Sequence, residues 1–278
     1  MSTAEVDLQT QLDEPYPLTA GHVEQFQRDG FIKLKDVLSP EVIEHFASEI
    51  TRLTLANNRN RDKPLAERDT YGQAFIQVGN LWTKSDEAKR FAFAKRVARI
   101  AAELLRAPGV RMWHDQALYK EPGGGFTPWH VDQQYWPMAS SKSVTAWMPL
   151  QAVPMEMGPL CFGRGSHLKN IGRELAISDE SERIIREEIK REGLLEVFEP
   201  YELGEVSFHY GWTLHRAGPN TTDRPRCVHT VIYMERDMRL AEPRNENQRR
   251  DWAGWTPSTQ VGEVMDDALN PVLWEERG

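Results

Sequence analysis

Two histidines, an aspartate and an arginine are the residues of this chain whose types and spacing best suit chemistry. His130 and Asp132 are separated by one residue, and His215 and Arg226 follow in the C-terminal half. Alternate side chains of an extended strand share a face, so His130 and Asp132 are expected to point the same way. Two imidazoles and a carboxylate form the facial triad of non-haem iron(II) oxygenases, which leaves coordination positions open. The spacing therefore predicts an iron(II) site made of His130, Asp132 and His215.

Arg226 adds a fixed cation close in sequence to the predicted metal site. Its planar guanidinium can hold a carboxylate through two parallel hydrogen bonds, which suits an acidic co-substrate. Arg224 is the alternative, but Pro225 separates the two arginines and Arg226 begins the apolar run that follows. Val228 and Thr230 would share the face of Arg226 in a strand. We therefore predict that Arg226 binds the acidic co-substrate.

The other histidines must be considered as alternative metal ligands. The chain has eight histidines, and a single histidine is most often a hydrogen-bonded structural residue. His209 could share a face with His215, but Gly211 interrupts the segment between them, so we assign His209 to hydrogen bonding. His167 follows a glycine-rich turn and is expected at the edge of the barrel. Neither is expected to bind the metal.

Several separate motifs carry a resemblance to a known family. They are Trp-His-Val-Asp and Tyr-Trp-Pro within 129–137, Gly-Arg-Gly-Ser-His at 163–167, Gly-Glu-Val-Ser-Phe-His at 204–209, and His215 followed by Pro219-Asn220 and Arg226. In this order the chain resembles the phytanoyl-CoA dioxygenase family of iron(II)- and 2-oxoglutarate-dependent oxygenases. The resemblance covers about residues 18 to 240.

The resemblance implies a co-substrate and its contacts. In the family, 2-oxoglutarate chelates iron(II) through its keto oxygen and one carboxylate, its far carboxylate is held by an arginine, and O2 is the oxidant. Arg226 matches that arginine. Thr145, Trp147, Gln116 and Gln77 are further candidates for contact with 2-oxoglutarate, and each of them also suits an ordinary core or surface position.

The resemblance also bears on the reaction and the substrate. Relatives that halogenate lack the carboxylate that Asp132 supplies, so the implied reaction is oxygenation, with hydroxylation as the default and desaturation, epoxidation or cyclisation as variants. Tyr135, Trp136, Trp212 and Trp82 suggest an aromatic pocket. By family analogy alone, the substrate is expected to be a small, partly apolar metabolite of natural-product or lipid-like metabolism.

Two other functions fit a barrel with these ligands. A zinc- or iron-dependent cupin-like isomerase or hydrolase would use the same histidines and carboxylate. It would give no reason for Arg226. A non-catalytic barrel that binds a metabolite would not need an intact triad. The oxygenase hypothesis is therefore the one that uses all four residues.

Composition limits the class of protein further. The chain has 278 residues and a net charge of −8, which suits one large domain without a basic nucleic-acid surface. No apolar run approaches the roughly 18 residues of a membrane span, and residues 1–16 lack a signal-peptide pattern. Cys161 and Cys227 are far apart in the sequence, so free thiols are the default. We expect a cytoplasmic protein that acts on a small molecule, without nucleic-acid or membrane partners.

The elements expected along the chain place the site in a β-rich region. Residues 1–16 are predicted to be a flexible arm, and 57–69 a surface loop that could border the site. Caps and apolar stripes predict helices at 39–55 and within 85–106. From residue 110 onward short strands follow, the clearest at 110–119, 143–153, 204–209 and 227–234.

Helices followed by closely spaced strands predict a mainly β core with flanking helices, an α+β fold. The resemblance further implies a double-stranded β-helix, the jelly roll of cupin-like proteins. We expect one oxygenase domain over 17–278, with helical support at 17–108, the β-helix core at about 109–240 and a C-terminal cover at 241–278. The cover is expected to pack on its own domain, and a homodimer interface is the alternative.

A charged helix is predicted to interrupt the strands at 179–193. Its Glu and Arg residues lie four apart and can pair across helical turns. A solvated insertion is the favoured interpretation. The alternative is a lid over the substrate, because the helix follows the motif at 163–167.

Overall fold

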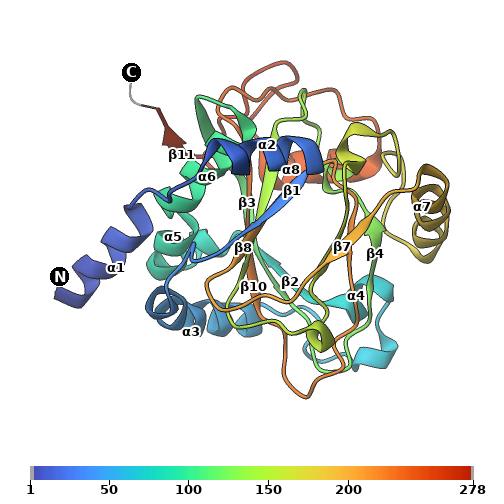
Figure 1. Ribbon diagram of the computed structural model, residues 1–278, viewed down its shortest axis with the longest axis horizontal. Coiled ribbons are helices and arrows are strands. Elements are labelled where there is room, and N and C mark those ends of the chain that lie inside the picture. Colours follow the sequence, from blue (N-terminus) through green and yellow to red (C-terminus); the bar gives the residue numbers. More distant parts are fainter. Residues whose placement is uncertain (1–2, 277–278) are drawn as a thin grey trace.

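Two antiparallel β-sheets form the centre of the protein in the computed structural model, which describes residues 3–276 (Figure 1). The larger sheet has the strand order β1-β8-β5-β10-β3-β11, and β2 also pairs with β3. The smaller sheet has the order β4-β9-β6-β7. The strands are β1 Phe31–Leu34, β2 Ile76–Gly79, β3 Gly109–Tyr119, β4 Thr127–His130, β5 Ser143–Pro149, β6 Leu160–Gly163, β7 Glu196–Phe198, β8 Val206–Tyr210, β9 His215–Ala217, β10 Val228–Glu235 and β11 Val272–Glu275.

Apolar side chains from both sheets meet between them. Phe31 of β1 stacks on Phe162 of β6 with ring centroids 4.4 Å apart, and Trp147 and Val228 of the larger sheet share one buried cluster with Leu160 of the smaller sheet. Two facing antiparallel sheets are the architecture of a jelly roll. The predicted mainly β core with flanking helices is confirmed, although no strand pairing joins the two sheets into a closed barrel among the described residues.

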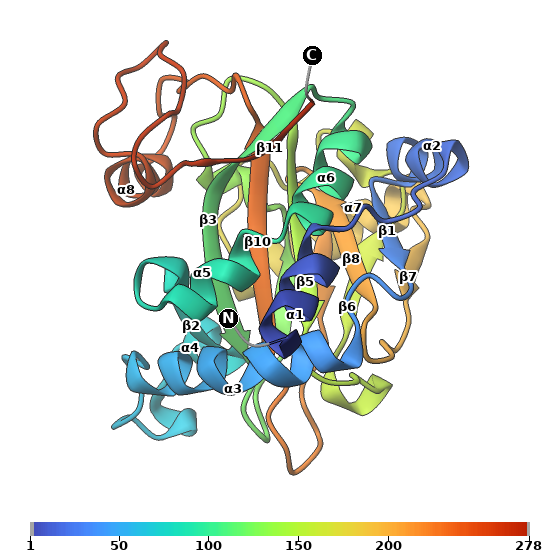
Figure 2. The ribbon, with the colours of Figure 1, turned by 90° about the vertical axis from the view of Figure 1, so that its left-hand side faces the viewer.

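Helices cover the outer face of the larger sheet, as Figure 2 shows for α1, α3, α5 and α6. The helices are α1 Thr3–Asp13, α2 Ala20–Asp29, α3 Pro40–Ala56, α4 Thr70–Ala74, α5 Asp86–Ala92, α6 Lys95–Leu105, α7 Asp179–Glu192 and α8 Glu246–Trp255. The apolar side of α6 packs on β3, β5, β10 and β11. This layer closes one side of the sheet, so the site can open only on the other.

The caps predicted from the sequence are present. Ser39 accepts a hydrogen bond from the Val42 N–H at the start of α3, and Ser85 begins α5. The helix predicted within 85–106 is two helices, because Ala94 adopts ψ 107° between α5 and α6. The break lets α5 pack on α3 while α6 packs on the sheet.

Three parts of the chain outside the predicted β-helix core at about 109–240 pack into the folded core of the protein. The prediction of a flexible arm at 1–16 is wrong for Thr3–Asp13, which form α1, and Leu12 is fully buried against the helical layer. Residues 1–2 lie outside the described part. The predicted helical support also supplies β1 and β2 to the larger sheet, and β11 of the C-terminal cover pairs with β3. The cover thus packs on its own chain, as expected.

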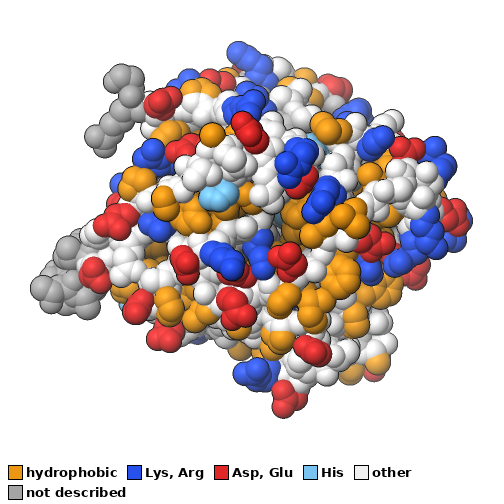
Figure 3. Space-filling model, viewed as in Figure 1, with side chains coloured by type: hydrophobic (Ala, Val, Ile, Leu, Met, Phe, Trp, Pro, Cys, Tyr) orange, Lys and Arg blue, Asp and Glu red, His pale blue; other side chains and the backbone are white. Residues whose placement is uncertain are grey.

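Acidic and basic side chains are interspersed over the face drawn in Figure 3, with no large area of one charge. None of the helices within residues 3–276 combines the length and apolar character needed to cross a bilayer. Cys161 and Cys227 are both free thiols.

Candidate metal centre and its pocket

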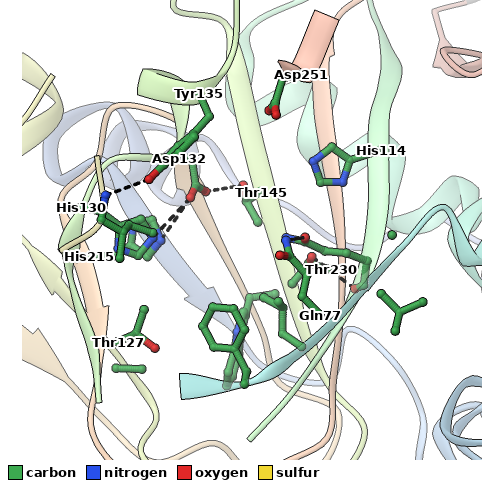
Figure 4. Close-up of a pocket in the computed structure, with 18 of the residues that line it drawn as sticks. Gln77, His114, Thr127, His130, Asp132, Tyr135, Thr145, His215, Thr230 and Asp251 are labelled. Carbon is green, nitrogen blue, oxygen red and sulfur yellow. Dashed lines mark hydrogen bonds and ion pairs between the residues drawn. The ribbon is translucent and has the colours of Figure 1, made fainter. Parts of the chain in front are cut away.

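The three predicted metal ligands lie together between the sheets (Figure 4). His130 ends β4 and pairs in register with His215, which begins the neighbouring strand β9. The Nε2 atoms of His130 and His215 each lie 3.5 Å from Oδ1 of Asp132, and the candidate ligand atoms are all within 4.8 Å of one another. The three residues thus form a compact group with ligand atoms that converge on one point.

Backbone carbonyls fix the orientation of both imidazoles. Nδ1 of His130 lies 2.8 Å from the Pro128 carbonyl oxygen, and Nδ1 of His215 lies 3.0 Å from that of Thr213. A protonated Nδ1 donates to each carbonyl, which leaves Nε2 with a free lone pair beside Asp132. Burial, with repulsion from His130, holds the pKa of His215 well below its usual range. A neutral, oriented imidazole is the form that binds a transition metal, so these residues fit iron(II).

The two oxygens of Asp132 have different surroundings. Oδ1 faces the two ligand histidines, whereas Oδ2 accepts hydrogen bonds from Thr145 Oγ1 at 3.1 Å and from His209 Nε2 at 3.3 Å. Two hydrogen-bond donors on Oδ2 favour the charged carboxylate over the neutral acid. The carboxylate is therefore charged, with Oδ1 directed to the candidate metal position.

Local backbone structure explains how these groups meet. β4 ends at His130, Val131 stays extended at φ −123° and ψ 135°, and Asp132 begins the short 3-10 helix η3, Asp132–Tyr135. The predicted alternation therefore holds for His130 and Asp132, although the strand itself stops. Between β8 and β9 the chain crosses from one sheet to the other at Gly211, where a Cβ would lie 2.5 Å from Ser143 Oγ. The crossing brings His209 and His215 to the site from opposite sheets.

Arg226 lines the same pocket from a position two residues before β10, where it forms an isolated bridge with Lys120, so the apolar run that it was expected to begin starts as a strand only at Val228. Its side chain is 2% exposed, its Nη1 donates to the Gly158 carbonyl, and its guanidinium lies 5.3 Å from the Trp147 ring centroid. Nε has no hydrogen-bond partner, and no carboxylate of residues 3–276 lies within 4 Å of it. Burial lowers the pKa of Arg226 to about 10. A buried cation without a counter-ion calls for an anionic ligand; Arg224, by contrast, is exposed.

Lys120 is a second buried basic group beside Arg226. The two residues form a backbone bridge, and the Lys120 ammonium donates to the Gly125 carbonyl. Burial and the charge of Arg226 lower the pKa of Lys120 to about 6. Near neutral pH Arg226 therefore carries the charge of this pair.

The other four candidate 2-oxoglutarate contacts all line this pocket. Gln77 of β2 donates to Gln116 of β3 across the strand pair. Thr145 uses its hydroxyl on Asp132, and Trp147 packs beside Arg226. The pocket brings these side chains together, and their contact with 2-oxoglutarate stays a prediction.

The pocket is a cavity of about 700 Å³ that is lined by both sheets and by segments outside them. Asn57, Arg59 and Asp69 contribute to it, which bears out the expectation that the loop at 57–69 borders the site. Tyr135 and Trp136 line it as expected, whereas Trp212 and Trp82 do not: the first packs beneath α7 and the second beside Phe93.

Sequence reasoning missed two parts of this wall. Thr127 of β4 lines the cavity with a buried hydroxyl that has no partner. Asn247, Arg250, Asp251 and Trp255 come from α8. Asp251 and Trp255 are four apart and share a helix face, a signal that could have been used, but the sequence does not tell which wall that face meets.

Helix α7 does not cover the pocket. Its Ile185 and Ile189 are buried against Trp129, and the Trp129 N–H donates to Glu182 at 2.7 Å. The helix thus packs on β4, and only the preceding residues Ala176 and Ile177 reach the cavity. His167 lies away from the metal ligands and bonds to the Gln27 carbonyl at 3.1 Å, as its predicted structural role requires.

The fold and the His–Asp–His group define a jelly-roll protein with a candidate metal site between its sheets. Comparison with known proteins agrees. The family model described as phytanoyl-CoA dioxygenase (PhyH) matches residues 26–228. The chain therefore belongs to the phytanoyl-CoA dioxygenase family.

Individual relatives are similar over most of the chain. An ectoine dioxygenase of Halomonas elongata is 28% identical over 255 residues, which are 84% of this chain and 75% of that protein. The non-haem α-ketoglutarate-dependent carbocyclase SnoK of nogalamycin biosynthesis has a TM-score of 0.76 at 24% identity, covering 93% of this chain and 99% of its own. EctD of S. alaskensis, solved with 2-oxoglutarate and 5-hydroxyectoine, has a TM-score of 0.65 at 22% identity and covers 92% of this chain and 90% of its own.

Proposed function

We propose that this protein is an iron(II)- and 2-oxoglutarate-dependent dioxygenase that hydroxylates, or otherwise oxidises, a small and partly apolar metabolite. One observation carries the proposal. A His–Asp–His group with its imidazoles already oriented shares a cavity with a buried arginine that has no counter-ion among residues 3–276. A metal site alone would not require a buried arginine. A dicarboxylate co-substrate uses both the metal and the arginine.

Each side chain has a defined task in this proposal. His130, Asp132 and His215 hold the metal on one side and leave the cavity side open. Iron(II) bound there would supply the oxidising chemistry with 2-oxoglutarate and O2. Arg226 binds the far carboxylate of 2-oxoglutarate through its unused donors, and Trp147 limits the position of the guanidinium.

The substrate class rests on the pocket and on the relatives. Tyr135, Trp136 and Trp255 give the cavity apolar surface, and polar groups lie between them. The names of the relatives include an ectoine dioxygenase and an enzyme of nogalamycin biosynthesis, which favours a small metabolite in natural-product metabolism over a lipid thioester. A cytoplasmic location and a homodimer stay predictions from the sequence.

Anaerobic titration tests this function directly. The apo-protein is titrated with iron(II) and then with 2-oxoglutarate, and the weak visible charge-transfer band of the chelate is followed. We expect the band in wild type and in the controls Arg224→Gln and His167→Gln. It should be lost in His130→Ala and shifted to much higher 2-oxoglutarate concentration in Arg226→Gln. Tight zinc binding with no chelate band would contradict the proposal and favour a cupin-like hydrolase or isomerase.

A further inference from the structure

The end of the cavity away from the ligand histidines contains a carboxylate that the proposed chemistry does not use. Figure 4 shows Asp251 and His114 on the side of the pocket opposite His130 and His215. Asp251 comes from α8 and lines the cavity. It is half-buried, and no Lys, Arg or His of residues 3–276 forms an ion pair with it within 4 Å.

The surroundings of Asp251 are mostly aromatic. Trp255 follows Asp251 by one turn of α8 and stacks on His114 with ring centroids 4.4 Å apart. Trp255 also fits tightly over Gly79, where a Cβ would lie 2.7 Å from the indole. Tyr135 is close enough that the charge of Asp251 contributes to its raised pKa, after burial and Asp132. The carboxylate thus stands among fixed aromatic rings.

Nearby basic groups do not neutralise Asp251. Arg250 precedes it on α8 and lines the same cavity, but its side chain is exposed, so water screens its charge. Burial lowers the pKa of His114 to about 4, so its ring is neutral. Desolvation also raises the pKa of Asp251 to about 7. A ligand with a positive charge would offset the cost of burying this carboxylate, and a neutral ligand would not.

We propose that this end of the cavity selects a substrate with a cationic nitrogen, an amine or quaternary ammonium, which Asp251 pairs and the rings of Trp255 and Tyr135 enclose. Aromatic faces around a carboxylate are a general way to bind such cations. The cation would be anchored at Asp251 while the rest of the substrate reaches toward the metal ligands. This inference deepens the proposed function and depends on it for the meaning of the cavity as a substrate site.

The test compares two probes of nearly identical shape. Choline carries a quaternary ammonium, and 3,3-dimethylbutan-1-ol is its neutral carbon isostere. Calorimetry measures the binding of each to the protein loaded with iron(II) and 2-oxoglutarate under argon. We expect choline to bind roughly tenfold more tightly than the isostere, and this preference to disappear in Asp251→Asn.

Two variants control for indirect effects. Glu246→Gln removes the same charge from the exposed first turn of α8 outside the cavity, and should keep the preference for choline. Trp255→Leu should weaken choline while leaving the isostere little changed. Equal binding of the two probes by wild type, no binding of either, or a preference that survives in Asp251→Asn would each overturn the inference.

Failure of this inference can be separated from failure of the proposed function. The chelate band reports the function and the probe preference reports the cation site. A chelate band without a choline preference overturns only the cation site. A choline preference in protein that forms no chelate band after addition of iron(II) and 2-oxoglutarate would overturn the oxygenase proposal and leave a cation-binding pocket.

Discussion

The two sheets contribute to the site in different ways. The smaller sheet supplies His130 and His215 from adjacent strands, and each imidazole is oriented by a carbonyl two residues before it. The larger sheet supplies Thr145 and His209, which hold Oδ2 of Asp132 from the opposite side. The nitrogen ligands are thus fixed by local structure, whereas the oxygen ligand depends on how the sheets pack.

The difference separates metal binding from co-substrate binding. In the proposed function, loss of a ligand on the smaller sheet would remove the metal itself, whereas loss of Arg226, which precedes β10 of the larger sheet, would remove only the partner of an anion. Cross-sheet hydrogen bonds to Asp132 lie between these cases, because they orient a ligand without being one. We expect the largest effects of substitution at the triad, smaller effects at Arg226 and smaller effects again at the donors to Oδ2 of Asp132.

The largest effect is expected from the triad. His215→Ala should lower iron(II) binding below detection and abolish conversion of 2-oxoglutarate to succinate, because two ligands do not make a facial site. Iron content by metal analysis and succinate release measure both. His167→Ala is the matched control and should bind iron as wild type does. Full turnover by His215→Ala would remove this residue from the site.

Substitution of Arg226, which precedes β10, should affect only the co-substrate. Arg226→Gln should raise the 2-oxoglutarate KM by about 100-fold, since a buried charge pair is lost, with iron affinity unchanged. Steady-state assays and metal titration separate the two quantities. The exposed Arg224→Gln should leave the KM within about twofold of wild type, as surface charges contribute little. If Arg224→Gln has the larger effect, the assignment of the two arginines is reversed.

Features fixed by local structure could be predicted from the sequence, whereas features that depend on packing between elements could not. His130 and Asp132 are one residue apart, so strand alternation was enough to predict their common direction, and Ser39 and Ser85 marked helix starts correctly. Asp251 could not be assigned to the pocket, because its place depends on α8 packing against η3. α1 was missed because its burial depends on Leu12 meeting the helical layer, a contact that no local pattern displays.

The cross-sheet support of Asp132 should have an intermediate effect. His209→Leu removes one donor to Oδ2 and should weaken iron(II) binding by roughly 10–100-fold, as is usual for residues that orient a metal ligand. His209→Gln can place an amide N–H near the position of Nε2 and should restore most of the affinity. Rescue by Gln distinguishes a hydrogen-bonding role from simple packing. Equal loss in both variants would show that the imidazole only fills space.

The smallest effect is expected at the Asp251 end, where pH sets the charge of the proposed cation site. The carboxylate has a pKa raised to about 7, so it is mostly charged at pH 8 and mostly neutral at pH 6. Only the deprotonated carboxylate of Asp251 pairs with a cation. Choline binding should therefore weaken by about tenfold from pH 8 to pH 6. His114 and Tyr135, which line the cavity beside Asp251, keep their charge over this range, because burial lowers the pKa of His114 to about 4 and raises the pKa of Tyr135. Calorimetry of choline at the two pH values, with Asp251→Asn as the variant that should show no such change, measures the effect. An unchanged affinity across the range would mean that the aromatic rings bind the cation without the carboxylate.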